Sequence, residues 1–353
     1  MKILDKYLGK EYLKLYFIFV LFFIAVFLLV DLFQSMDNLN KEAKILEVIQ
    51  YYLLQIPFLF SLLSPLGTIV SVLFVIAYLE KTLQIQALQV SGISMRRSFL
   101  AILTIGVVLS FSILLLNQTL TFEANKVAQR LKQENFIGRV QKGVQRNIFI
   151  HVPPSYLLYI RSFDLEKARM ENVLIYKESS PSSLIIAKEG EWNGKRWIFY
   201  EGRDYLMNGE KGTYFDKKIL PFSYEPSYFS KKYFPPDKMN IAKLRNYIDE
   251  YRKSGFKILN LETEMNFKFS YPFATFILLF LGIPVGLILK RGGRGASFGL
   301  GLIISFAYYE AMVLFKILGR EGIVFPLFAA WIPNLIFFAA GVYLFIYLDR
   351  GKI

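Results

Sequence analysis

The sequence predicts an α-helical membrane protein with six transmembrane helices and a large β domain inserted between the third and fourth helix. Hydrophobic residues make up 54% of the 353 residues, and long apolar stretches occur in two groups of three. A segment of alternating hydrophobicity separates the groups. A membrane-spanning helix needs about 20 mainly apolar residues. Six stretches qualify, namely 16–33, 53–79, 99–120, 269–289, 298–317 and 324–347. We therefore expect a first membrane half at 1–121, a β domain at 122–266 and a second membrane half at 267–353.

The basic residues near the ends of these stretches predict the orientation, because cytoplasmic loops are enriched in Lys and Arg. One side carries twelve, at positions 2, 6, 10, 14, 81, 96, 97, 290, 291, 294, 350 and 352. The short loops on the other side carry four, which are Lys41, Lys44, Lys316 and Arg320. Both termini and segment 80–98 are therefore expected in the cytoplasm, and the insert is expected on the opposite side of the membrane.

Seven candidate strands recur about every ten residues in the insert, a spacing that predicts an antiparallel sandwich or jelly roll. They are NIFIHV, SYLLYIRSF, ENVLIYK, SLIIAKEG, KRWIFYEG, RDYLMN and GTYFDKKILPF. The pair Asn193-Gly194 is typical of a hairpin turn, and Asn240 is the predicted cap of a short helix that leads to the fourth span. The apolar residues of these strands form either an ordinary core or the lining of an open sheet that holds acyl chains.

The segment EKTLQIQALQVSGISMRRSF, residues 80–99, is too polar to cross a membrane. Leu83, Ala87 and Val90 fall on one stripe of a helix. Gly92 interrupts this pattern, and Ser94 is the predicted N-cap of the following helix. A short helix between two spans either rests on the lipid surface or provides a docking element for a peripheral motor protein.

Ionisable residues inside predicted spans are informative because their burial in lipid is costly. Asp31 lies near the outer end of the first span, and Glu310 lies in the middle of the fifth. The alternatives for Glu310 are a proton relay, an ion pair between helices, a polar contact with a ligand and a structural hydrogen bond in the bundle. Glu262 and Glu264, by contrast, fall in polar sequence next to the fourth span, where we expect them to be solvated.

Motifs of common enzymes are absent from the sequence. There is no phosphate-binding loop and no nucleophile elbow, and one histidine with no cysteine is too little for a usual zinc site. We therefore expect no catalytic residue, no metal and no cofactor bound by this chain. The net charge of +14 is expected to meet membrane phosphates rather than nucleic acid.

Six segments make the sequence resemble the LptF/LptG permease family of the lipopolysaccharide exporter. They are ILDKYLGKEYLK, LVDLF, SPLGTIVSVL, QALQVSGISMRRSFLA, FSYPFATFILLFLGIPVGL and GIVFPLFAAWIPNLIF. The resemblance covers nearly the whole chain, and the layout of three spans, an insert and three spans agrees with it. The segments GEWNGKRWIFYEG and LFAAWIPN slightly favour the G type over the F type.

The resemblance implies one F-type and one G-type subunit in the inner membrane of a Gram-negative-type bacterium, above a cytoplasmic dimer of an LptB-type ATPase. That partner, and not this chain, would use ATP and Mg²⁺. Lipopolysaccharide would leave the outer leaflet between the two subunits, past gates formed by the first and fifth spans. It would then pass through periplasmic jelly rolls, of which the insert is one, to LptC- and LptA-type proteins.

The residue pattern and the resemblance together suggest roles for individual residues. The ATPase-coupling set is Glu80, Gln84, Leu88, Ser91, Gly92, Ile93, Arg96 and Arg97. The lipid head-group set is Lys41, Lys44, Lys316 and Arg320, the intramembrane gate set is Asp31 and Glu310, and the acyl-chain path is Phe149, Leu158, Ile160, Ile175 and Phe199. The family commonly has an acidic residue where this chain has Gln84, so either that contact is lost or Glu80 makes it.

Two other functions stay open at this point. The chain could be a membrane-anchored scaffold for envelope assembly without a transport path. It could also be a membrane enzyme acting on lipid-linked sugars, which is disfavoured because no cluster of His, Asp and Glu faces one side of the membrane.

Overall fold

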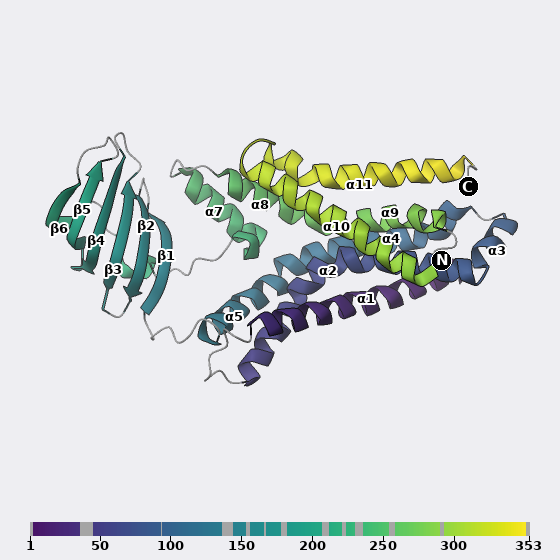
Figure 1. Cartoon of the computed structure of the whole chain (residues 1–353), viewed down its shortest axis with the longest axis horizontal. Coiled ribbons are helices and arrows are strands. Elements are labelled where there is room, and N and C mark those ends of the chain that lie inside the picture. Colours follow the sequence, from purple (N-terminus) through teal and green to yellow (C-terminus); the bar gives the residue numbers. More distant parts are fainter. Residues whose placement is uncertain are drawn as a thin grey trace.

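A computed structural model of the chain describes residues 3–35, 45–92, 94–135, 144–152, 156–165, 167–177, 182–206, 212–220, 224–229, 236–253, 258–289 and 293–350. The molecule is elongated, with a β sheet at one end and a bundle of long helices beside it (Figure 1). Both chain termini lie at the far end of the bundle. We call the two ends of the bundle the sheet end and the distal end.

The six predicted spans are confirmed as six helical stretches long and apolar enough to cross a membrane. Five of them are α1 (Ile3–Ser35), α2 (Ile45–Lys81), α4 (Met95–Gln118), α10 (Gly293–Arg320) and α11 (Pro326–Asp349). The fourth in sequence is composite and consists of α8 (Leu259–Ser270), a short 3₁₀ turn η3 (Tyr271–Phe273) and α9 (Ala274–Ile288). Residues 259–268, which precede the predicted apolar stretch, therefore belong to the same composite helix.

Helix α2 is the centre of the bundle. In its most apolar window 72% of the residues are buried, against 17% in α1 and 22% in α10. Gly67 allows α1 to approach closely, because an added Cβ would lie 2.4 Å from Val20 Cγ2. Gly282 of α9 does the same against Val72, at 2.5 Å. Small residues at such crossings are the usual means of packing helices in a membrane, where van der Waals contact drives association.

Two hydroxyl groups from other elements bond to the turn of α2 before a proline. Pro65 lacks a backbone N–H, so the carbonyl of Ser61, four residues earlier, receives no helical hydrogen bond from it. The hydroxyl groups of Tyr271 and Tyr309 both donate to the next carbonyl, that of Leu62, at 2.9 and 2.6 Å. Neighbouring elements commonly supply such bonds where a proline interrupts a membrane helix. These bonds tie η3 and α10 to the same turn of α2.

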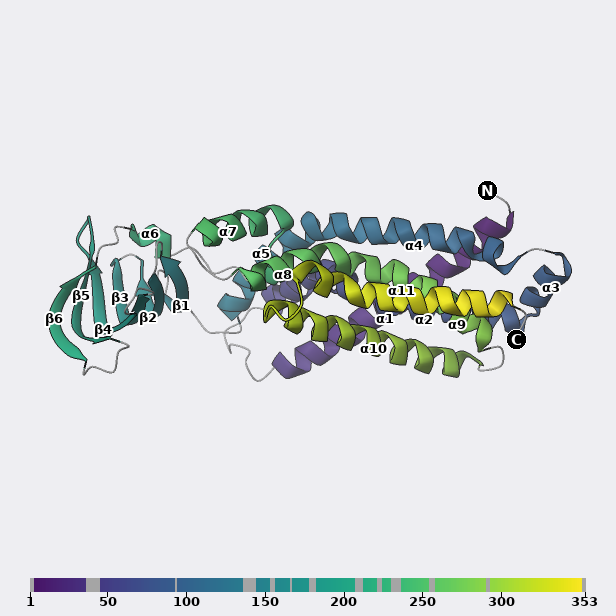
Figure 2. The ribbon, with the colours of Figure 1, turned by 90° about the horizontal axis from the view of Figure 1, so that it is seen from above.

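Shorter helices lie at the end of the bundle that is near the sheet, and one of them lies over the sheet itself (Figure 2). They are α5 (Leu120–Asn135), α6 (Pro226–Phe229), η2 (Pro236–Lys238) and α7 (Ile241–Lys253). The predicted cap of α7 is confirmed, because Asn240 Oδ1 accepts from the backbone N–H of Lys243 at 2.9 Å. Helix α7 buries Leu244 and Ile248 against Phe122 of α5, so its apolar stripe holds it on the sheet end of the bundle.

The inserted domain contains one antiparallel sheet. Its strands are β1 (Val144–Val152), β2 (Tyr156–Asp164), β3 (Arg169–Lys177), β4 (Ser183–Trp192), β5 (Trp197–Leu206) and β6 (Thr213–Ile219). An inserted antiparallel β domain is therefore confirmed. The sequence predicted, in more detail, a sandwich or jelly roll. The described strands instead form one sheet in which they pair in the order β1 to β6. Short connections join each strand to the next as hairpins, and this produces an up-and-down sheet rather than crossing connections.

Two of the strands each contain one residue with an unusual backbone conformation. Asn172 in β3 and Glu201 in β5 both have positive φ values, 49° and 48°, and the alternation of buried and exposed residues changes phase around them. The predicted strands KRWIFYEG and RDYLMN are therefore one strand, β5, and the prediction of a break there was wrong. The broken alternation reflects an irregularity within the strand and not a loop. The Asn193-Gly194 hairpin is confirmed, with Trp192 paired to Trp197 across it.

Candidate functional site

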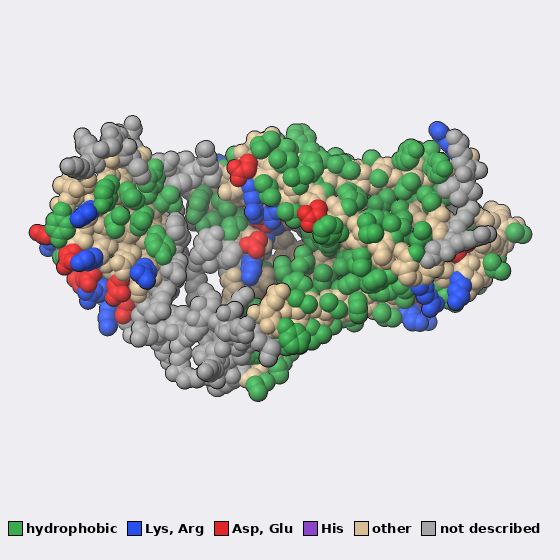
Figure 3. All heavy atoms as spheres, in the orientation of Figure 1, with side chains coloured by type: hydrophobic (Ala, Val, Ile, Leu, Met, Phe, Trp, Pro, Cys, Tyr) green, Lys and Arg blue, Asp and Glu red, His purple; other side chains and the backbone are tan. Residues whose placement is uncertain are grey.

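A cavity of about 350 Å³ lies at the sheet end of the bundle, and we call it the sheet-end cavity. Its wall comes from α2, the end of α4, α5, η2, α8, η3 and α10. The wall consists of Phe58, Ser61, Leu62, Asn117, Gln118, Thr121, Phe122, Asn125, Asp237, Lys238, Met239, Glu264, Phe267, Lys268, Tyr271, Tyr309, Met312, Val313 and Lys316. Figure 3 shows basic and acidic side chains gathered beside a hollow between the sheet and the bundle.

A buried carboxylate organises the charges of this cavity. Glu264 on α8 is only 5% exposed. Its oxygens lie 2.9 Å from Lys316 Nζ and 3.0 Å from Arg320 Nη2. Lys316 and Arg320 are one helical turn apart on α10, so one carboxylate can reach both. The expectation that Glu264 is solvated was wrong, because α10 packs against α8 and covers it. Glu262, on another side of α8, is paired with Arg252 at 2.9 Å and is more exposed.

Lys268 adds a positive charge one turn along α8 from Glu264. Its Nζ donates to the Asp237 carbonyl oxygen at 2.6 Å, and in the described part of the chain it has no carboxylate within ion-pair distance. Among the described residues, Lys238, Lys268, Lys316, Asp237 and Glu264 line the cavity, and Arg320 binds Glu264 from outside the wall. In this described set, four cations and two carboxylates leave a formal charge of +2. Such a site with mainly apolar walls has the chemistry to hold an anionic amphiphile.

The distal end carries the segment predicted to dock a partner. Helix α3 (Gln84–Val90) follows α2 after Leu83, whose φ is 59°. Ile85 is buried, whereas Leu83 and Val90 are 66% and 90% exposed. The predicted stripe of Leu83, Ala87 and Val90 thus points away from the chain's own core. Leu88 is half-buried, and Glu80 accepts a hydrogen bond from Gln86 Nε2 at 2.9 Å.

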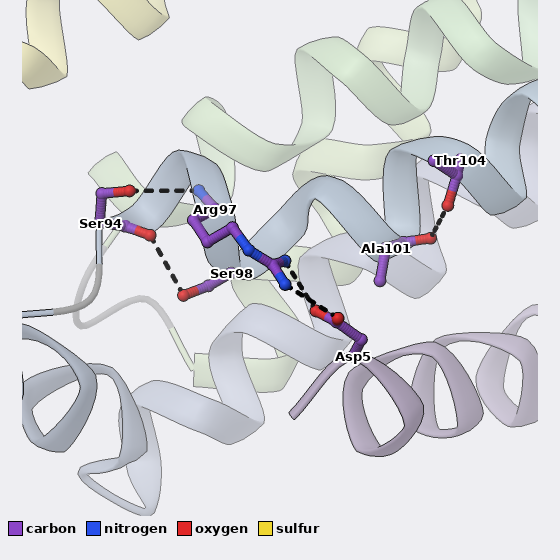
Figure 4. Close-up of polar contacts among 6 residues, drawn as sticks. All are labelled: Asp5, Ser94, Arg97, Ser98, Ala101 and Thr104. Atoms are coloured by element: carbon purple, nitrogen blue, oxygen red, sulfur yellow. Dashed lines mark hydrogen bonds and ion pairs between the residues drawn. The ribbon is translucent and has the colours of Figure 1, made fainter. Parts of the chain in front are cut away.

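An ion pair fixes the helix that follows this segment to the start of the chain (Figure 4). Arg97, in the first turn of α4, donates from both terminal nitrogens to Asp5 of α1 at 2.8 and 3.0 Å. The Asp5 residue is 6% exposed. The predicted cap is confirmed, since Ser94 Oγ accepts from the backbone N–H of Arg97. Bidentate pairs of this kind fix relative orientation as well as distance. The start of α1 and the first turn of α4, which follows α3 in the chain, are therefore held together.

The gate residues lie in different surroundings. Asp31 is half-buried near Tyr51 and Tyr52 of α2. Glu310 is exposed on α10, where Phe306 and Val313 are also exposed, at 66% and 53%. No described residue forms a hydrogen bond or ion pair with Glu310, so the alternative of a structural bond within this chain finds no support among the described contacts.

Four predicted acyl-path residues belong to the core of the β domain. Leu158, Ile160, Ile175 and Phe199 are fully buried in one cluster. Phe229 of α6 covers part of this cluster with its ring against Trp197, at 5.2 Å between centroids. In this conformation the four residues therefore act as ordinary core.

Several predicted residues fall outside the description. Lys41, Lys44 and Ile93 lie outside the described residues, and the side chains of Arg96 and Phe149 do as well. The backbone of Phe149 pairs with Tyr159, one register position away from the pairs that contain Leu158 and Ile160. Ser91 and Gly92 form the turn after α3, where Gly92 has a φ of 72°.

The family model for the lipopolysaccharide export system permease LptF/LptG matches residues 6–347. The chain belongs to the LptF/LptG family. This membership confirms the resemblance seen in the sequence and makes the chain a component of a transporter rather than an enzyme. The family model covers both types, and the preference for the G type stays a prediction. A comparison with curated protein sequences gave no match.

Sequence reasoning missed five charged residues that the structure brings into these sites, namely Asp5, Asp237, Lys238, Glu264 and Lys268. A signal for two of them was present. Glu264 and Lys268 are four residues apart at the start of the fourth span, and Lys316 and Arg320 are four residues apart at the end of the fifth. Two such pairs at the same predicted end of a bundle can meet face to face. No comparable pattern marks Asp5, which is paired with a residue 92 positions away.

Proposed function

We propose that this LptF/LptG chain is a transmembrane subunit of an ATP-driven lipopolysaccharide exporter in the inner membrane. It would extract lipopolysaccharide from the outer leaflet and pass it toward a periplasmic bridge. The observation that carries the proposal is the placement of two different surfaces on one bundle. A cationic cavity with apolar walls lies at the sheet end, and an exposed apolar segment lies at the distal end.

The exposed faces of α1 and α10 favour the presence of a second membrane subunit that packs against them. Apolar residues such as Phe22, Val26 and Phe33 of α1 are between 43% and 70% exposed. Lipid can cover apolar side chains, but Glu310 on α10 needs a polar partner because a carboxylate in hydrocarbon is costly. We propose that the other LptF/LptG-type subunit packs here, and that the lipid enters between the two chains at Asp31 and Glu310.

The distal segment is the evidence for binding of a peripheral motor protein. Ile85 anchors α3 to the core while Leu83 and Val90 remain exposed, which is the arrangement expected of a short helix that enters a groove. We propose that an LptB-type ATPase dimer, using ATP and Mg²⁺, binds this segment. Glu80, Gln84 and Leu88 would contribute, together with Ser91, Gly92, Ile93, Arg96 and Arg97. The termini would then be cytoplasmic.

The β domain would deliver the lipid onward. With the distal end in the cytoplasm, the sheet projects from the opposite side of the membrane, where LptC- and LptA-type proteins would receive the cargo. Acyl chains would pass along Phe149, Leu158, Ile160, Ile175 and Phe199 after the cover formed by α6 moves. The head group would be attracted by Lys41, Lys44, Lys316 and Arg320, with Lys316 released from Glu264 and Arg320 still bound to it.

In-cell photocrosslinking tests this proposal. A photoreactive residue replaces Val90 in α3, Val313 in the cavity wall, or Val108 of α4, which is 63% exposed and serves as the matched control. We expect an ATPase adduct from position 90, a lipopolysaccharide adduct from position 313 and neither adduct from position 108. An ATPase adduct without a lipid adduct would contradict the assigned cargo. Equal lipid adducts at 313 and 108 would show general membrane contact, and the absence of both adducts would favour the scaffold alternative.

A further inference from the structure

We propose that the sheet-end cavity binds the phosphate-bearing head of a membrane lipid, and that the phosphate displaces Glu264 from Lys316. The proposal assigns Lys268 as a phosphate contact and Glu264 as a competing anion. This proposal rests on the proposed function only in one respect, namely where the bound lipid is taken to be the exported lipopolysaccharide. The binding chemistry itself is a property of this chain.

The cavity wall contains both apolar and charged residues, as an amphiphile requires. Its apolar part includes Phe58 and Leu62 of α2 and Met312 and Val313 of α10. Val313 is 53% exposed, so the apolar wall continues onto the outer surface of α10 and gives an acyl chain a route in from the membrane. The volume of about 350 Å³ lies within the range of small-molecule pockets, and it can take part of a lipid but not a whole one.

The charged residues of the wall favour a phosphate. Lys268 and Lys316 both line the cavity, and among the described contacts the Lys268 ammonium group bonds only to a backbone carbonyl. A lysine ammonium is a compact point charge that binds phosphate well. The charged residues lie at the sheet end of α8 and α10, the level at which lipid head groups meet the ends of spans. A neutral lipid would gain nothing from these cations.

Glu264 occupies the position that an incoming phosphate would need. Its carboxylate is held by Lys316 and Arg320 and is almost inaccessible to water. A phosphate that reaches Lys316 from the cavity brings negative charge next to this carboxylate, and like charges repel strongly where water is scarce. Arg320 does not line the cavity, so it can retain Glu264 while Lys316 turns to the phosphate. The exchange therefore leaves no carboxylate without a cation.

The test measures lipid retention by the full chain, purified with its membrane partners and placed in nanodiscs of a neutral lipid. Phosphatidylglycerol, purified lipopolysaccharide and diacylglycerol are titrated separately, and native mass spectrometry reports the bound lipid. The variants are Lys268→Gln, Lys316→Gln and Glu264→Gln. Lys243→Gln is the matched control, because Lys243 is a lysine at the same end of the bundle outside the cavity wall.

We expect Lys268→Gln and Lys316→Gln to weaken binding of phosphate-bearing lipids about tenfold, the factor that corresponds to one charge-assisted hydrogen bond. Glu264→Gln should strengthen binding, because the competing charge is lost, and Lys243→Gln should leave binding unchanged. Diacylglycerol should bind weakly to all variants. The melting temperature of each variant in the absence of lipid reports whether its fold is intact, and Lys316→Arg provides a variant that keeps the charge and should keep the binding.

Two results would overturn the proposal. The first is equal retention of diacylglycerol and phosphate-bearing lipids, which would remove the role of the phosphate. The second is weaker binding in a well-folded Glu264→Gln variant, which would make Glu264 part of the site rather than a competitor. Preference for lipopolysaccharide identifies the ligand as cargo, and equal binding of phosphatidylglycerol identifies a resident bilayer lipid. Both support the site, and an export assay on Lys268→Gln tests the proposed function separately.

Discussion

A buried hydrogen-bond chain between three helices gives a prediction whose size can be worked out. Tyr308 of α10 donates to Asn334 Oδ1 of α11, and Asn334 Nδ2 donates to the Ser270 carbonyl at the end of α8, at 3.0 Å. All three residues are at most 2% exposed. These two hydrogen bonds hold α10 near α8 by way of α11. Helices α8 and α10 are the two that bring Glu264 and Lys316 together. The perturbation is Asn334→Leu, which keeps the number and branching of the side-chain heavy atoms and removes both bonds.

Each bond between helices in a membrane contributes about 0.6 kcal/mol on average and up to about 1.7. Two lost bonds should therefore lower the free energy of unfolding by about 1–3 kcal/mol. Tyr308→Phe removes only the first bond and should cost roughly half as much. Because both changes remove that same bond, the double variant should be less destabilised than the sum of the single variants.

Unfolding by SDS in mixed micelles, followed by the far-ultraviolet circular dichroism of the helices, measures these differences. The three variants and the unmodified chain are compared in the same detergent. The reasoning would be refuted if Asn334→Leu unfolded at the same SDS fraction as the unmodified chain. It would also fail if the two single effects were additive within about 0.3 kcal/mol, the usual limit for independent sites, because the residues would then not be coupled.

Three further predictions concern other parts of the chain. Asp5→Asn should reduce the amount of lipid exported per ATP hydrolysed by the assembled complex, without reducing assembly. The double variant Asp5→Arg with Arg97→Asp should restore part of that export. An unchanged ratio of export to hydrolysis in Asp5→Asn would show that the ion pair between α1 and α4 does not contribute to coupling. Gly67→Ala should destabilise the bundle by about 1–3 kcal/mol through overpacking, and adding Val20→Ala should recover part of the loss in the same SDS titration. The pKa of Lys243 is lowered, first by burial and then by the nearby Lys126, so the folded state disfavours its charge and stability should rise as the pH passes this pKa. Lys243→Gln should accordingly stabilise the fold at neutral pH, with an advantage that fades toward about pH 10.4, where lysine in an unfolded chain loses its proton; an advantage that persists at higher pH would contradict a charge effect.

The sequence by itself determined the membrane architecture. Six apolar stretches of sufficient length leave no other way to satisfy the backbone in lipid, so their presence and order follow from composition and hydrogen bonding. Local signals also sufficed for Ser94, Asn240 and the Asn193-Gly194 hairpin, because caps and turns depend on residues only a few positions apart. The cationic character of Lys316 and Arg320 could likewise be recognised from their place at the end of a span.

Only the tertiary structure decided which residues these groups meet. Glu264 was expected in solvent, but it lies under α10, and Asp5 pairs with Arg97 across 92 positions of sequence. The irregularity at Glu201 lies within one strand where two were predicted, since a change in alternation has the same appearance as a loop in a single sequence. Contacts between distant segments depend on how helices rotate and cross, and this is set by the packing of many side chains together. Local periodicity specifies which face of a helix is apolar, and the assembled bundle specifies what that face touches.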